Sequence, residues 1–118
     1  MLTRLWWNLV RFGFRLLYNE MAFTYDAVSW LVSLGQWRSW QRASMRFLPQ
    51  PESGLVLELA HGTGNLQIDL QQAGYQTVAF DLSPYMGQIA KRKAIKNNLR
   101  QKFVRGSAFQ LPFRDDTF

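Results

Sequence analysis

Residues 55–65 read Leu-Val-Leu-Glu-Leu-Ala-His-Gly-Thr-Gly-Asn, an apolar run followed directly by a turn that contains two glycines. A short apolar run is typical of a strand buried on both faces, which places a strand over Leu55–Ala60. The stretch 66–73 then has a helical pattern, and Gly74 is suited to end it. A strand, a glycine turn and a helix in this order predict the first unit of a parallel sheet.

The same order of elements continues along the chain. The pattern predicts a second strand at 76–80, a helix at 84–97, a third strand at 102–105 and irregular chain from 106 to 118. Ser83 can cap the helix and Pro84 fits its first turn. The expected fold class is α/β, a Rossmann-like doubly wound parallel sheet represented by its first three strands. A buried first strand would then have one apolar, unpaired edge, so we expect the chain to be the N-terminal part of a larger sheet.

The residues before the sheet have a different pattern. Helices are expected at 2–18, 25–34 and 36–48, and Pro49 and Pro51 end helical structure. We therefore predict a helical cap over residues 1–51 and the main fold over residues 52–118.

The first of these helices is amphipathic. Its polar residues Arg4, Asn8, Arg11 and Arg15 gather on one side, and large aromatic side chains fill much of the rest. Such a helix could lie in a membrane interface, or it could cover the core or a substrate pocket, which we favour. The arginines interrupt the only stretch that could span a membrane, and no signal peptide is evident, so a cytoplasmic protein is expected.

Composition excludes several classes of site. The chain has 118 residues, no cysteine and one histidine, His61, which leaves no disulfide, no thiol nucleophile and no expected metal site. The net charge of +6 is uneven, since residues 51–90 hold four acids and no base. Eight bases follow in residues 91–118, but they are not accompanied by an aromatic ladder. We therefore expect a solvated surface there rather than a nucleic-acid site.

The glycine turn is suited to a nucleotide. A P-loop is excluded because no Gly-Lys-Ser/Thr occurs. The dinucleotide fingerprint matches at one glycine of three, because Ala60 and Asn65 stand at its first and sixth positions. Glu58 and Asp81 end the first two strands, where carboxylates suit a ligand with ribose hydroxyls and a cationic end. These acids favour S-adenosylmethionine over a pyrophosphate.

Three segments carry a resemblance to a known family. Residues 55–64 resemble motif I of class I S-adenosylmethionine-dependent methyltransferases, and Asp81-Leu82-Ser83-Pro84-Tyr85-Met86 resembles the ribose-binding segment of that family. Residues 103–118 are similar to its adenine-bordering segment. The order and spacing are similar to those of the ubiquinone and menaquinone biosynthesis branch, which Tyr25-Asp26 also fits.

The resemblance implies roles for individual residues. Glu58 would steady the turn and help to place the methionine amine, and Gly62 and Gly64 would permit close backbone approach. Asp81 would bind ribose. The remaining implied cofactor contacts are Leu82 and Met86 beside adenine and Ser107 and Ala108 at its edge. Two departures are Ala60, where glycine is usual, and Ser107, where an aspartate often receives the adenine amine.

The implied activity is methyl transfer from S-adenosylmethionine to a small apolar acceptor such as a quinone precursor or a lipid. No catalytic residue can be assigned from the sequence, and His61 is more readily interpreted as structural than as a general base. The alternatives are a dinucleotide-binding oxidoreductase and a noncatalytic interaction module. We expect the 118 residues alone to be inactive, because they hold only half of a cleft.

Overall fold

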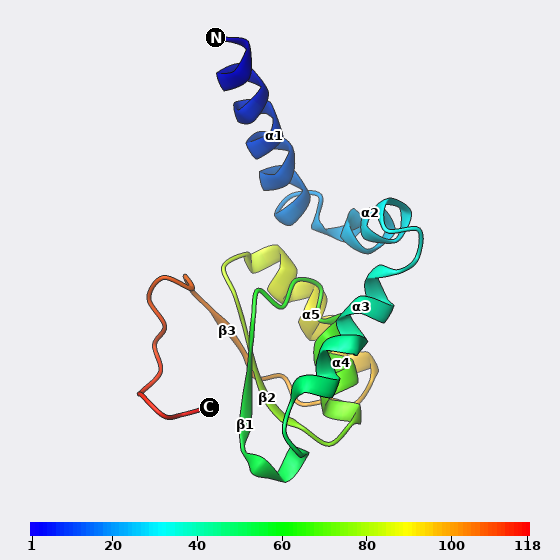
Figure 1. The fold of residues 1–118 in the computed structure, drawn as a ribbon, viewed down its shortest axis with the longest axis vertical. Helices are drawn as coiled ribbons and strands as arrows, with labels where there is room; N and C mark the ends of the chain where they lie inside the picture. The colour runs from blue at the N-terminus through cyan, green and yellow to red at the C-terminus, as the bar shows by residue number, and fades with distance from the viewer.

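The computed structural model describes residues 1–118 and contains a three-stranded parallel sheet (Figure 1). The strands are β1 (Leu55–Leu59), β2 (Gln76–Asp81) and β3 (Phe103–Arg105), in the order β1-β2-β3. Leu55 pairs with Gln76, and Ala79 pairs with Phe103. The predicted fold class is confirmed, and β1 is an outer strand with one neighbour, as expected.

Two helices cover one face of the sheet (Figure 1). They are α4 (Asn65–Gln72) and α5 (Pro84–Lys96), which pack on β2 and against each other. The core between them and the sheet is made of small and medium side chains, namely Leu70, Ala79, Met86, Ala90 and Ala94. Ser83 caps α5 as predicted, since its Oγ accepts a hydrogen bond from the Met86 N–H at 3.3 Å.

The opposite face of the sheet is covered more thinly. Phe80 of β2 is buried there because the C-terminal segment crosses it, and the Phe80 and Phe113 rings meet edge to face with centroids 5.9 Å apart. Phe118 packs against Phe113 in the same way at 5.0 Å. Leu59, which alternation places on this face with Phe80, stays exposed.

The N-terminal helices are α1 (Leu2–Tyr18), α2 (Tyr25–Val32) and α3 (Trp37–Ser44). Short 3₁₀ turns lie at Ala22–Thr24, Met45–Phe47 and Pro51–Ser53. The second and third helices are shorter than expected, because Leu34 and Gly35 take left-handed backbone conformations and the last residues of the third become a 3₁₀ turn. The division of the chain at residue 51 remains a prediction.

The favoured prediction for α1 is wrong. Its sequence favours a helix that covers the core or a pocket, but α1 projects away from the sheet (Figure 1) and has no buried residue. Its only firm attachment is at its C-terminal end, where the Ser83 hydroxyl donates to the Tyr18 carbonyl at 2.6 Å and Ala22 is buried beside α5. None of the helices is both long enough and apolar enough to cross a membrane.

Candidate functional site

The glycine turn, residues 60–64, follows β1 at the carboxyl edge of the sheet. β1 stops at Leu59, one residue earlier than expected, because Ala60 has a φ of 57° that ends extended structure. Gly62 and Gly64 also have positive φ, at 57° and 83°. Three left-handed residues within five turn the chain sharply from the strand into α4.

Asp81 holds this turn in place. One carboxylate oxygen accepts the Gly62 N–H at 2.9 Å and the other accepts the Ser83 N–H at 2.8 Å. The side chain therefore joins the glycine turn to the start of α5. A carboxylate has about four acceptor positions, so Asp81 keeps capacity for further donors such as hydroxyl groups.

The two glycines of the turn have different surroundings. A Cβ on Gly62 would meet no atom within 4 Å, whereas a Cβ on Gly64 would lie 2.8 Å from the Ala90 Cβ. Gly62 thus leaves open space beside its backbone. Gly64 is buried against α5, so glycine is needed at this position because any larger residue would collide with that helix.

Glu58 is a partly desolvated carboxyl group just below the turn. Burial raises its pKa from 4.5 to about 7, the Gln67 hydrogen bond opposes this shift, and the nearby Asp81 charge adds to it. Glu58 accepts from the Gln67 amide at 2.6 Å, and Gln67 accepts from the Thr77 hydroxyl at 2.7 Å. The acid is therefore fixed in position by a chain of buried side chains.

His61 has a structural position. It is 4% exposed, its ring packs on Phe103 with centroids 5.1 Å apart, and its Nδ1 lies 2.7 Å from the Gly62 carbonyl oxygen. A carbonyl can only accept, so Nδ1 carries a proton in this arrangement. Burial lowers the pKa of His61, although the Asp81 charge opposes this, and the ring is neutral at neutral pH.

A pocket of about 270 Å³ lies beside His61 and Asp81, at the carboxyl ends of β2 and β3. Among the residues that line it are His61, Asp81, Ser83, Gly87, Lys91 and Phe103.

Asp81 is the one implied cofactor residue that lines this pocket, since Glu58 and the glycines of the turn lie beside it and the other implied contacts lie elsewhere. Met86 differs most from its expected place, because it is fully buried in the core and offers no surface to a ligand. Leu82 and Ala108 are exposed outside the pocket, and Ser107 is half-buried, with its hydroxyl accepting from the Phe109 N–H at 3.3 Å.

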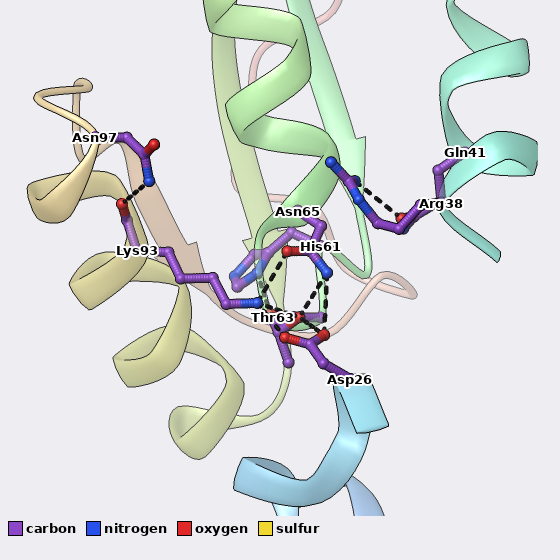
Figure 2. A network of polar contacts seen from close by, with 9 residues as sticks. Asp26, Arg38, Gln41, His61, Thr63, Asn65, Lys93 and Asn97 are labelled. Atoms are coloured by element: carbon purple, nitrogen blue, oxygen red, sulfur yellow. Dashed lines mark hydrogen bonds and ion pairs between the residues drawn. The ribbon is translucent and has the colours of Figure 1, made fainter. Parts of the chain in front are cut away.

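The structure also brings together a cluster that the sequence analysis missed (Figure 2). We call Asp26, Thr63, Asn65 and Lys93 the cap cluster. Asp26 of α2 accepts from the Thr63 hydroxyl at 2.6 Å and the Asn65 amide at 3.0 Å, and it forms an ion pair with Lys93 of α5. Lys93 also donates to Asn65 at 2.9 Å and Thr63 at 3.1 Å. The cluster thus ties the cap to the glycine turn and to both sheet-covering helices.

Only a weak signal in the sequence pointed to this cluster. Asp26 is the one acid between Glu20 and Glu52, in a stretch rich in arginine. Lys93 belongs to the basic run that we predicted to be a solvated surface, and for this residue that prediction is wrong. Burial alone would raise the pKa of Asp26, but hydrogen bonds from Lys93, Thr63 and Asn65 lower it below its ordinary value.

Replacing Lys93 with methionine is expected to lower the free energy of unfolding by about 1–2 kcal/mol, less than for a fully buried pair because Asp26 keeps access to water. The pKa of Asp26 is lower in the folded state than its ordinary 3.8, so its contribution is complete above that pH and is lost as the pH falls through the folded value. Urea unfolding across the acidic range should show a shallower loss of stability in Lys93→Met. Lys96→Met, which removes an exposed lysine of the same helix, is the control and should behave like the parent.

Comparison with known proteins identifies relatives of the whole α/β unit. The profile of the ubiE/COQ5 methyltransferase family matches residues 13–118. The chain is 34% identical over 104 residues to a demethylmenaquinone methyltransferase of Thermus thermophilus, covering 86% of this chain and 47% of that protein. It is 36% identical over 102 residues to one of Beutenbergia cavernae, covering 86% and 41%.

A solved structure is similar as well. The PH0226 protein from Pyrococcus horikoshii OT3 matches with a TM-score of 0.62 and 26% identity, over 87% of this chain and 44% of that one. The chain therefore spans less than half the length of the relatives it matches.

Proposed function

Since this chain belongs to the ubiE/COQ5 methyltransferase family, we propose that its whole protein transfers a methyl group from S-adenosylmethionine to a small apolar acceptor of the quinone-precursor kind. The observation that carries the proposal is the joint placement of Gly62, Asp81 and Glu58 at the carboxyl edge of the sheet. Open α/β sheets bind their ligands at that edge.

The residues present suit S-adenosylmethionine. The open space beside Gly62 admits a ligand close to the backbone, since no side chain stands there. Asp81 retains acceptor capacity for a pair of ribose hydroxyls beside the pocket at β2 and β3. When bound, this cofactor supplies a methyl group on a positively charged sulfur.

Glu58 suits the cationic end of that cofactor. In the free protein its pKa of about 7 leaves it partly protonated at neutral pH. A nearby ammonium favours the charged carboxylate and would lower this pKa. Glu58 would then release a proton as it gains a cationic partner, so binding would be accompanied by proton release near neutral pH.

The proposed methyl acceptor is a quinone-like molecule. The relatives from Thermus and Beutenbergia are named demethylmenaquinone methyltransferases, which favours a quinone-like acceptor. Tyr18 and Tyr25 bring aromatic rings from the cap toward the carboxyl edge, with centroids 5.5 Å apart and with Tyr18 close enough to sense the Asp81 charge. We propose that these rings border the acceptor and that catalysis depends mainly on alignment of the reacting atoms. No side chain is proposed as a catalytic base.

The dinucleotide alternative is disfavoured by Asn65. A dinucleotide fingerprint has its third glycine at this position, whereas Asn65 is held in the cap cluster by Asp26 and Lys93. Isothermal titration calorimetry with S-adenosylmethionine and with NAD separates the two. Tighter binding of NAD would contradict the proposal.

Asp81→Asn is expected to weaken binding of S-adenosylmethionine about 10–100-fold, because hydrogen bonds to a charged acceptor contribute about 1.5–3 kcal/mol. Calorimetry gives the affinity, and urea unfolding of the same variant shows whether the glycine turn has also loosened. Glu52→Gln removes an exposed acid far from the edge and should bind like the parent. An unchanged affinity in Asp81→Asn would mean that the ribose lies elsewhere.

A further inference from the structure

α1 projects away from the rest of the fold (Figure 1), and none of its residues is buried. Seven of its large apolar side chains are more than half exposed, including Trp6 at 62% and Leu9 at 61%. The other side chains that are more than half exposed are Leu2, Leu5, Trp7, Phe12 and Phe14. A contiguous apolar surface of this kind marks an interaction site rather than ordinary surface.

The polar side of α1 is small and carries one sign of charge. With 100° between successive residues, Arg4, Asn8, Arg11 and Arg15 fall within a sector of about 60°. The helix has no acidic residue in 17, so its charge is +3. Aromatic and leucine side chains occupy most of the remaining circumference. A basic face opposite tryptophan, phenylalanine and leucine is the pattern of helices that lie in a lipid interface.

Two further observations favour a lipid partner over a second copy of the chain. A second copy of α1 would add three more positive charges and no acid, so no charge complementarity would favour pairing. The family profile matches residues 13–118, so residues 2–12 of the helix lie outside that match. Tryptophan and arginine together suit the boundary between acyl chains and negatively charged headgroups. We propose that α1 docks in the plane of a membrane surface that contains anionic lipids.

Docking in this way would set the orientation of the body. The C-terminal end of α1 is fastened at Tyr18 to Ser83, the residue that follows the Asp81 loop. The carboxyl edge of the sheet would therefore lie next to the lipid surface. This proposal does not depend on the proposed function, because lipid binding is measured without cofactor or acceptor.

The test is cosedimentation of the protein with vesicles. Vesicles of an equimolar mixture of phosphatidylcholine and phosphatidylglycerol should retain the protein, and vesicles of phosphatidylcholine alone should retain much less. Added salt should weaken the binding to charged vesicles, because it screens the arginines. The triple variant Arg4→Gln, Arg11→Gln, Arg15→Gln should bind about 100-fold more weakly, at about tenfold per 1.4 kcal/mol and about 1 kcal/mol per charge.

The matched control removes the same charge elsewhere. Arg92→Gln, Lys96→Gln, Arg100→Gln neutralises three exposed bases near the far end of α5 and should bind like the parent. Trp6→Ser, Leu9→Ser removes exposed apolar surface without touching the core and should abolish binding to both kinds of vesicle.

Three outcomes would overturn the proposal. The first is equal binding to charged and uncharged vesicles. The second is an equal loss in the control variant. The third is a self-association without lipid that Trp6→Ser, Leu9→Ser removes, seen by sedimentation velocity, together with no vesicle binding by the parent. That result would assign the apolar side of α1 to a second copy of the chain.

Discussion

Replacing Glu58 with glutamine is expected to raise the free energy of unfolding by about 3 kcal/mol at about pH 8. The pKa of Glu58 is about 7 in the folded protein, against an ordinary value of 4.5. Between these two values the folded state holds a proton that the unfolded state has lost. Stability of the parent therefore falls as the pH rises through this window, and the variant, which has nothing to ionise, is spared that loss.

The measurement is urea unfolding of parent and variant over a range of pH. The two should have similar stability below pH 4.5, diverge between 4.5 and about 7, and differ by a constant amount above that. Glutamine keeps an oxygen that can accept from the Gln67 amide, so the buried chain to Thr77 survives. Glu52→Gln changes an exposed acid and should show no divergence. Parallel profiles for parent and Glu58→Gln would mean that Glu58 is as well hydrated in the folded state as in the unfolded one.

The same substitution is expected to weaken binding of S-adenosylmethionine while it stabilises the free protein. A carboxylate that destabilises the fold at neutral pH is expected of a group that serves binding rather than folding, which is the role proposed for Glu58 above. A variant that gained stability and kept full affinity would remove Glu58 from the proposed site.

Gly64→Ala is expected to lower the free energy of unfolding by about 2–5 kcal/mol. A Cβ at a left-handed residue costs about 1–2 kcal/mol, and forcing a methyl group into filled space costs about 1–3 kcal/mol more. The new Cβ would lie 2.8 Å from the Ala90 Cβ and 3.0 Å from the Ala90 Cα, so α5 itself would have to move.

Two other glycines make this test specific. Gly62→Ala has the same backbone strain but open space around the new Cβ, so about 1–2 kcal/mol is expected. Gly87 lies inside α5 with nothing near its Cβ position, and Gly87→Ala should be stabilising by about 1 kcal/mol because alanine favours helix. Thermal or urea unfolding of the three variants should give this order. If Gly62→Ala and Gly64→Ala lowered the free energy of unfolding equally, α5 would have to shift at Ala90 without cost, which would contradict this prediction.

Local patterns in the sequence were sufficient to predict the strands and helices of the sheet. The apolar run before the glycine turn, the Ser83–Pro84 helix start and the alternation of strands with helices depend on neighbours along the chain, and the structure has them all. Met86 also follows a local pattern that indicates its burial. It shares the spacing of four with Ala90 and Ala94, and these three residues form the buried side of α5.

Features that depend on distant residues could not be predicted in the same way. The Asp26–Lys93 ion pair joins residues 67 positions apart, and neither residue has a local signature that names the other. The amphipathic pattern of α1 shows which side is apolar but not what covers it. Either a protein core or a lipid layer can bury the apolar side of such a helix. The amphipathic pattern alone therefore does not indicate which of the two contacts α1.

The order of strands in the sheet has a consequence for how the chain folds. Each strand pairs with the next one along the chain, and the partners Leu55 and Gln76 are 21 residues apart. The contacts that fasten the cap, Tyr18 to Ser83 and Asp26 to Lys93, close loops of 65 and 67 residues. Closing the longer loop in an unfolded chain costs about 1 kcal/mol more in entropy. The route of lowest cost therefore pairs the strands first and docks the cap on a sheet that already exists, so the glycine turn acquires its link to Asp26 at the end of folding.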